Sequence, residues 1–135
     1  MAKPTTEDAR LVVEFAKIAA ELKLAQAQDW MWSDQFPPNY EDFVKKYPRG
    51  TAEHARALQI CNFYETIGAL WKQGLFSEEM IFEWLWIAGP WERMKGFALA
   101  QRKAANNDSI FELFEGMAEA QKKLIEKVPV GASAR

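Results

Sequence analysis

The feature that most constrains this chain is the stretch from Asn62 to Trp91, NFYETIGALWKQGLFSEEMIFEWLWIAGPW, where large apolar residues alternate with helix-ending residues. Gly74 and Leu75 follow a helical run, which is the order found where a left-handed glycine ends a helix. Ser77 and the two glutamates behind it then favour the start of a second helix. The stretch therefore predicts a tight helical hairpin.

The second helix of this hairpin is expected to run from Glu78 to Ala88 and to be apolar around nearly its whole circumference. Glu83 is its only charge between Met80 and Ala88. A helix of this kind is normally enclosed by others or covered by a partner. It is too short to span a bilayer, which needs about 20 residues. Gly89 and Pro90 are expected to close it and to open a third helix.

The rest of the chain supplies amphipathic helices that can pack around the hairpin. They are expected from Thr5 or Thr6 to about Gln28, from Tyr40 to Tyr47, from Thr51 to Gln73, and from a capping box at Ser109 and Glu112 to Pro129. The segment DWMWSDQFPPN is expected to be a loop. On the helix before Gly74, Gly68 is expected to mark the close approach of another helix, since glycine is unfavourable in a helix interior.

No segment alternates with the period of a strand, so the predicted fold is all-α. We expect a helical bundle of five to six helices around a central Trp-rich helical hairpin. The predicted domain organisation is a single helical domain over residues 1–135, in which 1–5 and 129–135 are frayed tails.

Composition limits the function classes. The net charge is −2 and the pI is about 5.5, so nothing attracts nucleic acid as a general partner. Cys61 is the only cysteine, which suits a reducing cytoplasm and excludes an internal disulfide. Charged residues interrupt the first apolar run, so we expect neither a signal peptide nor membrane insertion.

The residues that commonly carry catalysis or bind metals do not form a motif. His54 is the only histidine, and its place in the first turn of a helix predicts an ordinary exposed residue. Glu112, Glu115 and Glu119 share a helix face with lysines, which predicts a solvated surface. We therefore expect no catalytic residue, no metal and no cofactor.

Asn62 and Glu65 are a polar pair on an otherwise apolar helix. If other helices cover them, both need hydrogen-bond partners, which Arg93 and Arg102 could supply. The first interpretation is a structural network that fixes how two helices cross. The alternative makes Glu65 an acid/base or ligand-holding group in a pocket lined by tryptophan.

The tryptophans allow a similar choice. Trp84, Trp86 and Trp91 can simply fill the core, or they can leave an exposed aromatic patch that serves as an interface. A small bundle with an almost wholly apolar helix can use such a face to form a homodimer.

One family resembles this chain. The matching residues are Asn62-Phe63-Tyr64-Glu65, Ile67-Gly68, Gly74-Leu75, Trp91, Asn107-Asp108-Ser109-Ile110-Phe111 and Phe114-Glu115. In their order and spacing they resemble bacterial proteins of the domain of unknown function 4760 family, over about the C-terminal half to two-thirds of the chain. The resemblance implies a helical domain and no particular activity. Members of that family often carry an apolar N-terminal anchor, whereas the first helix here is charged on one side.

The sequence thus predicts a soluble, cytoplasmic protein-interaction or self-associating module without catalytic activity. The alternative is a small-ligand-binding domain or enzyme with a pocket around Glu65, Asn62 and neighbouring tryptophans.

Overall fold

The computed structural model describes residues 3–127, and within them all regular structure is helical. The helices are α1 (Thr6–Glu21), α2 (Leu24–Trp32), α3 (Tyr40–Lys46), α4 (Ala52–Lys72), α5 (Glu78–Trp84), α6 (Ala88–Ala105) and α7 (Glu112–Lys127). The all-α prediction is confirmed. The described part of the chain has seven helices instead of five to six, because the predicted first helix is two helices.

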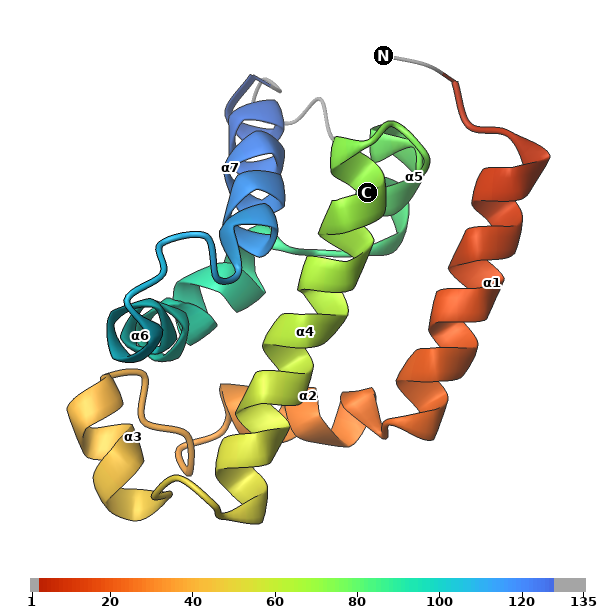
Figure 1. The fold of residues 1–135 in the computed structure, drawn as a ribbon. Coiled ribbons are helices and arrows are strands. Elements are labelled where there is room, and N and C mark those ends of the chain that lie inside the picture. The colour runs from red at the N-terminus through yellow and green to blue at the C-terminus, as the bar shows by residue number, and fades with distance from the viewer. Residues whose placement is uncertain (1–2, 128–135) are drawn as a thin grey trace.

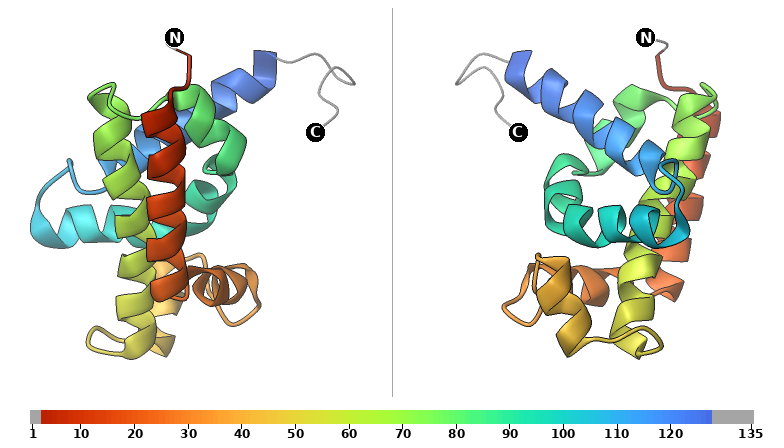
Figure 2. Two further views of the ribbon diagram at one scale, coloured as in Figure 1. Left: turned by 90° about the vertical axis from the view of Figure 1, so that its right-hand side faces the viewer. Right: turned by 60° about the vertical axis from the view of Figure 1, so that its left-hand side comes forward.

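Helix α4 occupies the middle of the bundle. Figure 1 shows α1 running antiparallel to it on one side, with α6 and α7 on the other, and α2 crossing near its start. Figure 2 shows the same order from two further sides, with α6 lying across α4. Helix α4 contacts α2, α6 and α7. Its fully buried residues, which include Ile60, Tyr64 and Ile67, therefore form the centre of the core.

The break between α1 and α2 differs from the prediction of one helix to about Gln28. Lys23 adopts a left-handed conformation with φ of 55°, and α2 then continues to Trp32, through part of the predicted loop. The change of direction lets Leu24, Ala27 and Met31 all become buried. Burial of this second apolar face offsets the strain of a left-handed lysine.

The turn between α4 and α5 confirms the predicted hairpin. Gly74 has a φ of 72°, and the amide of Leu75 donates a 2.9 Å hydrogen bond to the carbonyl of Leu70. The Ser77 side chain accepts from the amide of Met80, as a helix cap does. The backbone of Leu75 turns back as predicted, although its side chain is exposed.

Helix α5 ends at Trp84, so the prediction of a helix to Ala88 is wrong at its C-terminal end. Leu85, Trp86 and Ile87 form a short non-helical link, and α6 begins at Ala88. This link is stabilised by side-chain hydrogen bonds from another helix, which replace the helical ones. Proline and glycine therefore lie inside the first turn of α6, where proline is tolerated.

Thr5, the last residue of the tail predicted over 1–5, belongs to the start of α1, and residues 1–2 lie outside the described range. Thr5 caps α1 and forms a reciprocal capping box with Asp8. The Asp8 carboxylate also accepts a 2.8 Å hydrogen bond from the amide of Ser77, which ties α1 to α5. The other predicted tail, 129–135, lies outside the described residues.

Two further observations complete the fold. A Cβ atom on Gly68 would lie 2.8 Å from the Cβ of Leu113, so the predicted close approach of a second helix is confirmed, and that helix is α7. None of the helices in the described range is both long enough and apolar enough to cross a membrane.

Candidate interaction surface

Two tryptophans from distant segments stack on one another at the surface. Trp32 is the last residue of α2, and Trp86 lies in the link between α5 and α6. Their ring centroids are 5.6 Å apart and their planes differ by 7°. Trp32 is 47% exposed and Trp86 is 60% exposed. We call these two residues the tryptophan pair.

A glycine makes room for Trp86 in this stack. The ring of Trp86 lies against Gly89 in the first turn of α6, and a Cβ atom on Gly89 would overlap the six-membered ring. Any larger residue at position 89 would push the indole away. Gly89 is therefore required by the position of Trp86 in addition to any role in the helix start.

Gln121 on α7 holds the link that carries Trp86. Its Oε1 accepts hydrogen bonds from the amides of Ile87 (2.6 Å) and Ala88 (2.9 Å), and its Nε2 donates to the carbonyl of Leu85 (2.8 Å). The Gln121 side chain is buried. Each polar group of the amide is thus used to fix the backbone on both sides of Trp86.

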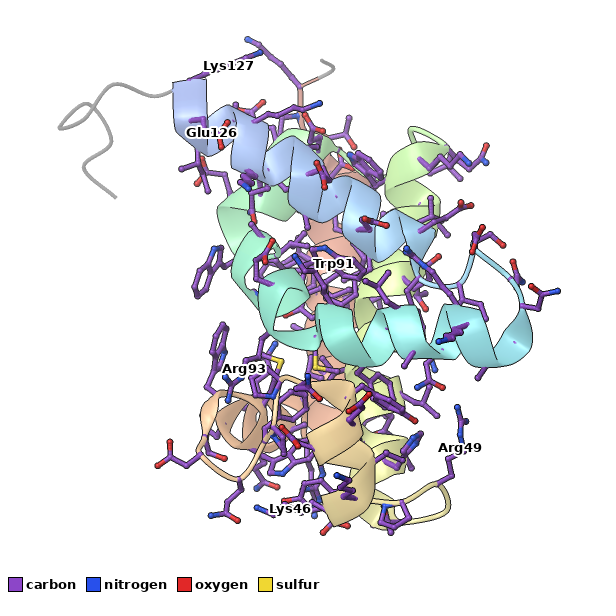
Figure 3. The ribbon with its side chains drawn as sticks, turned by 90° about the vertical axis from the view of Figure 1, so that its left-hand side faces the viewer. Lys46, Arg49, Trp91, Arg93, Glu126 and Lys127 are labelled. Atoms are coloured by element: carbon purple, nitrogen blue, oxygen red, sulfur yellow. The ribbon has the colours of Figure 1, made fainter. Side chains whose placement is uncertain are left out.

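Arg93 on α6 holds the segment that follows Trp32. Its Nε donates to the carbonyl of Met31 (2.6 Å), and its Nη2 donates to those of Ser33 (2.9 Å) and Phe36 (3.0 Å). The guanidinium also lies over the Phe36 ring. Figure 3 shows Arg93 at the junction of α6 with the α2 segment. A cation here binds backbone carbonyls at and just after the end of α2, which is the negative end of the helix dipole.

Glu65 has a different partner from those predicted. Its Oε1 accepts hydrogen bonds from the amides of Leu113 (3.1 Å) and Phe114 (2.9 Å), at the start of α7. This carboxylate therefore caps α7, in place of the predicted capping box at Ser109. Burial raises the pKa of Glu65, and the two amide hydrogen bonds lower it by less.

The other three residues of the predicted network are spread over the molecule. Arg102 donates to the carbonyl of Ile110 and forms a 2.8 Å ion pair with Glu115. Its positive charge also acts to lower the pKa of Glu65. Arg93 bonds the α2 segment, and Asn62 is exposed on α4. Of the four residues, only Glu65 and Arg102 are brought into electrostatic contact.

The predicted interface tryptophans also separate. Trp91 is 4% exposed and packs edge-on against Phe114, inside the bundle between α6 and α7 (Figure 3). Trp84 is half-buried and packs among Phe15 and other rings. Only Trp86 of these three presents most of its side chain to solvent, so Trp91 is a core residue.

His54 and Cys61 are both buried. The prediction of an exposed histidine is wrong: His54 is enclosed by aromatic rings that include Phe43 and Phe97, and its Nε2 lies 3.4 Å from the Tyr40 hydroxyl. Burial, and then the charge of Arg49, hold the pKa of His54 below its usual value. Burial raises the pKa of the Cys61 thiol, which therefore stays protonated and unreactive.

Two hollows in the described surface are lined by residues of α1. One depression of about 160 Å³ lies between α1 and α4 and is lined in part by Phe15, Asn62 and Phe63. A second hollow of about 480 Å³ is lined by residues of α1 between Thr6 and Glu14. Neither is lined by Glu65 or a tryptophan. Within residues 3–127, no three His, Cys, Asp or Glu side chains are placed to hold a metal ion.

Sequence reasoning missed Trp32, Gln121 and Gly89 as parts of one surface. Trp32 lies in a segment predicted to be a loop. Gln121 is a polar residue within the apolar face of its helix, four positions after Met117, a signal that the sequence analysis did not use. Tryptophan and glycine content pointed to the right segments. Which tryptophans are exposed depends on contacts between segments more than 30 residues apart.

A family model described as Domain of unknown function (DUF4760) matches residues 4–121. Neither the curated proteins nor the solved structures include a match to the chain.

Proposed function

Because the chain belongs to the family described as Domain of unknown function (DUF4760), a description that specifies no activity, we propose a function from its surface. The chain is a protein-interaction module without catalytic activity. It contacts a partner protein, or a second copy of itself in a homodimer, through the tryptophan pair. On the evidence of its single buried cysteine, we also propose that it works in the cytoplasm.

The exposure of a pre-arranged aromatic stack is the observation that carries this proposal. Trp32 and Trp86 are 47% and 60% exposed, whereas Trp91 is buried and the remaining tryptophans are partly buried. Tryptophan is enriched among the residues that dominate binding energy at protein interfaces. A stack that is already formed loses little conformational freedom on binding, which favours association.

The support beneath the pair strengthens the proposal. Gln121 and Arg93 together make six hydrogen bonds to the backbone around the two tryptophans. Glu65, which the alternative function would use to hold a ligand, instead accepts two amide hydrogen bonds at the start of α7. The polar chemistry of this chain therefore serves to position a surface.

Site-specific photo-crosslinking tests the proposal. A photoreactive amino acid replaces Trp86 in one variant and Leu99 in a control variant, because Leu99 is also an exposed apolar residue but lies on α6 away from the stack. We expect protein adducts from position 86 that are absent from position 99. Each adduct is identified by mass, and the purified partner is then titrated against the wild-type chain and against Trp32→Ala.

Sedimentation velocity separates the two forms of contact. A homodimer gives an adduct of twice the chain mass and a sedimentation coefficient that rises with concentration in the wild type but not in Trp86→Ala. A different partner gives an adduct of another mass and a monomeric wild-type chain. Equal labelling from positions 86 and 99, or no adduct from either, would contradict the proposal.

A further inference from the structure

The segments that carry the tryptophan pair contain only acidic charges. Residues 24–44 and 73–92 each contain four acidic residues and no lysine, arginine or histidine. The whole chain has a net charge of −2, so the remaining residues together carry +6. The charge of the molecule is therefore unevenly distributed along the chain, and the exposed indoles lie in its acidic segments.

Three of these acids are close in sequence to the tryptophans and are exposed. Asp29 precedes Trp32 by three residues on α2, a spacing that places both on one side of the helix. Asp34 lies two residues after Trp32, and Glu83 lies three residues before Trp86. Within the described residues, neither Asp29 nor Asp34 takes part in an ion pair.

Arg93 is the cation that the structure places beside this surface. Three carbonyl oxygens accept its N–H groups, so much of its charge is already compensated by the end of α2. Lys95 is two residues further along α6, on a different side of the helix, and is paired with Glu92 at 3.2 Å. Arg93 therefore reduces the negative potential at this surface, and its guanidinium lies over Phe36 instead of over Trp32 or Trp86.

We infer that the partner presented to the tryptophan pair is a flexible peptide segment containing arginine or lysine. An indole is the best aromatic partner for a cation placed over its face, and nearby carboxylates add to the attraction. The indole N–H groups of Trp32 and Trp86 make no hydrogen bond within the described chain, so they can donate to carbonyls of the bound segment. The inference rests on the proposed function and specifies its partner class.

The exposed area favours a short segment over a second globular copy. Two half-exposed indoles are a small part of the roughly 800 Å² that each partner buries in a stable protein interface. Short charged peptides can bind such a small site weakly and reversibly. Truncating one indole is expected to weaken binding about two- to fivefold, the size of one exposed cation–π contact.

Nuclear magnetic resonance of the indole N–H groups tests this inference. The probe is a glycine-spaced peptide with three arginines, and the matched control replaces each arginine by citrulline, which has the same shape without the charge. We expect the signals of Trp32 and Trp86 to move with the arginine peptide and not with the citrulline peptide. Asp29→Asn and Asp34→Asn are expected to weaken binding, and Glu119→Gln, an exposed acid on α7, to leave it unchanged.

The outcomes separate this inference from the proposed function. Equal responses to the two peptides, or shifts that leave Trp32 and Trp86 unmoved, would overturn the cationic partner. If the indole signals shift with protein concentration alone, the occupant is a second copy, and the inference fails while the proposed function stands. Absence of adducts from position 86 in the photo-crosslinking experiment would instead remove the proposed function itself.

Discussion

Glu65 caps the amino end of α7 by accepting a 2.9 Å hydrogen bond from the amide of Phe114, 49 residues further along the chain. The same oxygen accepts from the amide of Leu113. Helix caps usually come from the residue just before the helix. Here the cap comes from the middle of α4. One side chain therefore accepts hydrogen bonds from unpaired amides at the start of α7 and also fixes where α7 crosses α4.

The loss of stability on substituting Glu65 should therefore depend on whether the new side chain keeps an acceptor oxygen. Glu65→Ala removes both hydrogen bonds and should lower the free energy of unfolding by about 1–2 kcal/mol. Glu65→Gln keeps an oxygen in the same place and should cost less. Urea unfolding of the two variants at pH 7 measures the difference, and equal losses would mean that the oxygen does not act as the cap.

The raised pKa of Glu65 predicts that the stability of the fold falls as the pH rises. The pKa of Glu65 is raised above its usual 4.5 in the folded chain, so the folded state binds this proton more tightly than the unfolded state. Its contribution to stability is present below pH 4.5 and is lost as the pH rises through the raised pKa. Glu65→Gln should therefore gain stability relative to the wild type over that rise.

Gly68 and Gly116 provide a matched test of the contact between α4 and α7. Gly68→Ala places a Cβ atom 2.8 Å from that of Leu113, and such overpacking typically costs about 1–3 kcal/mol. The better helix propensity of alanine offsets about 1 kcal/mol of this cost, so we expect a net loss of stability. Gly116→Ala meets Trp71 at an ordinary 3.4 Å and should stabilise by up to about 1 kcal/mol. Similar effects of the two substitutions on the melting temperature would refute the close crossing.

His54 should make the fold less stable in mild acid. Its pKa is held below 6.5 in the folded chain, so the unfolded chain binds the proton more tightly. Its contribution to stability is present above pH 6.5 and is lost as the pH falls through the lowered pKa. His54→Phe removes this titration. Urea unfolding at pH 7.5 and at pH 5 should show a larger loss for the wild type than for the variant, and equal losses would contradict the burial of a neutral imidazole.

Gln121 should contribute far more to stability than an exposed glutamine. Gln121→Ala leaves two amides and a carbonyl of the Leu85–Ala88 link without partners, which should cost about 2–4 kcal/mol. Gln59→Ala, at an exposed position on α4, should change stability by less than about 0.5 kcal/mol. Denaturant midpoints of the two variants give the comparison, and a mild effect at position 121 would show that the link holds its shape without α7.

Local sequence signals predicted the parts of this fold that depend on neighbouring residues. Gly74 with Leu75 and the cap at Ser77 act within a few residues, and both were correct. The end of α5 and the start of α7 are instead determined by Gln121 and Glu65, which lie more than 30 residues away. A pattern read within one segment has no access to such partners.

The exposure of the tryptophans at the candidate surface could not be predicted from the local sequence either. The tryptophan-rich stretch was correctly identified as unusual, but its sequence did not distinguish buried Trp91 from exposed Trp86. That distinction arises because the chain leaves its helix at Leu85, which turns the next side chain outward onto Trp32. The stack therefore depends on two segments meeting in space.

The most direct test of the account is a measurement of contact between the two indoles in solution. Nuclear Overhauser effects should connect the ring protons of Trp32 and Trp86 in the wild-type chain. They should disappear in Gly89→Ala, where the new Cβ displaces the Trp86 ring, while the amide spectrum of the core stays unchanged. Absence of these effects in the wild type, or their persistence in Gly89→Ala, would contradict a stacked pair held over Gly89.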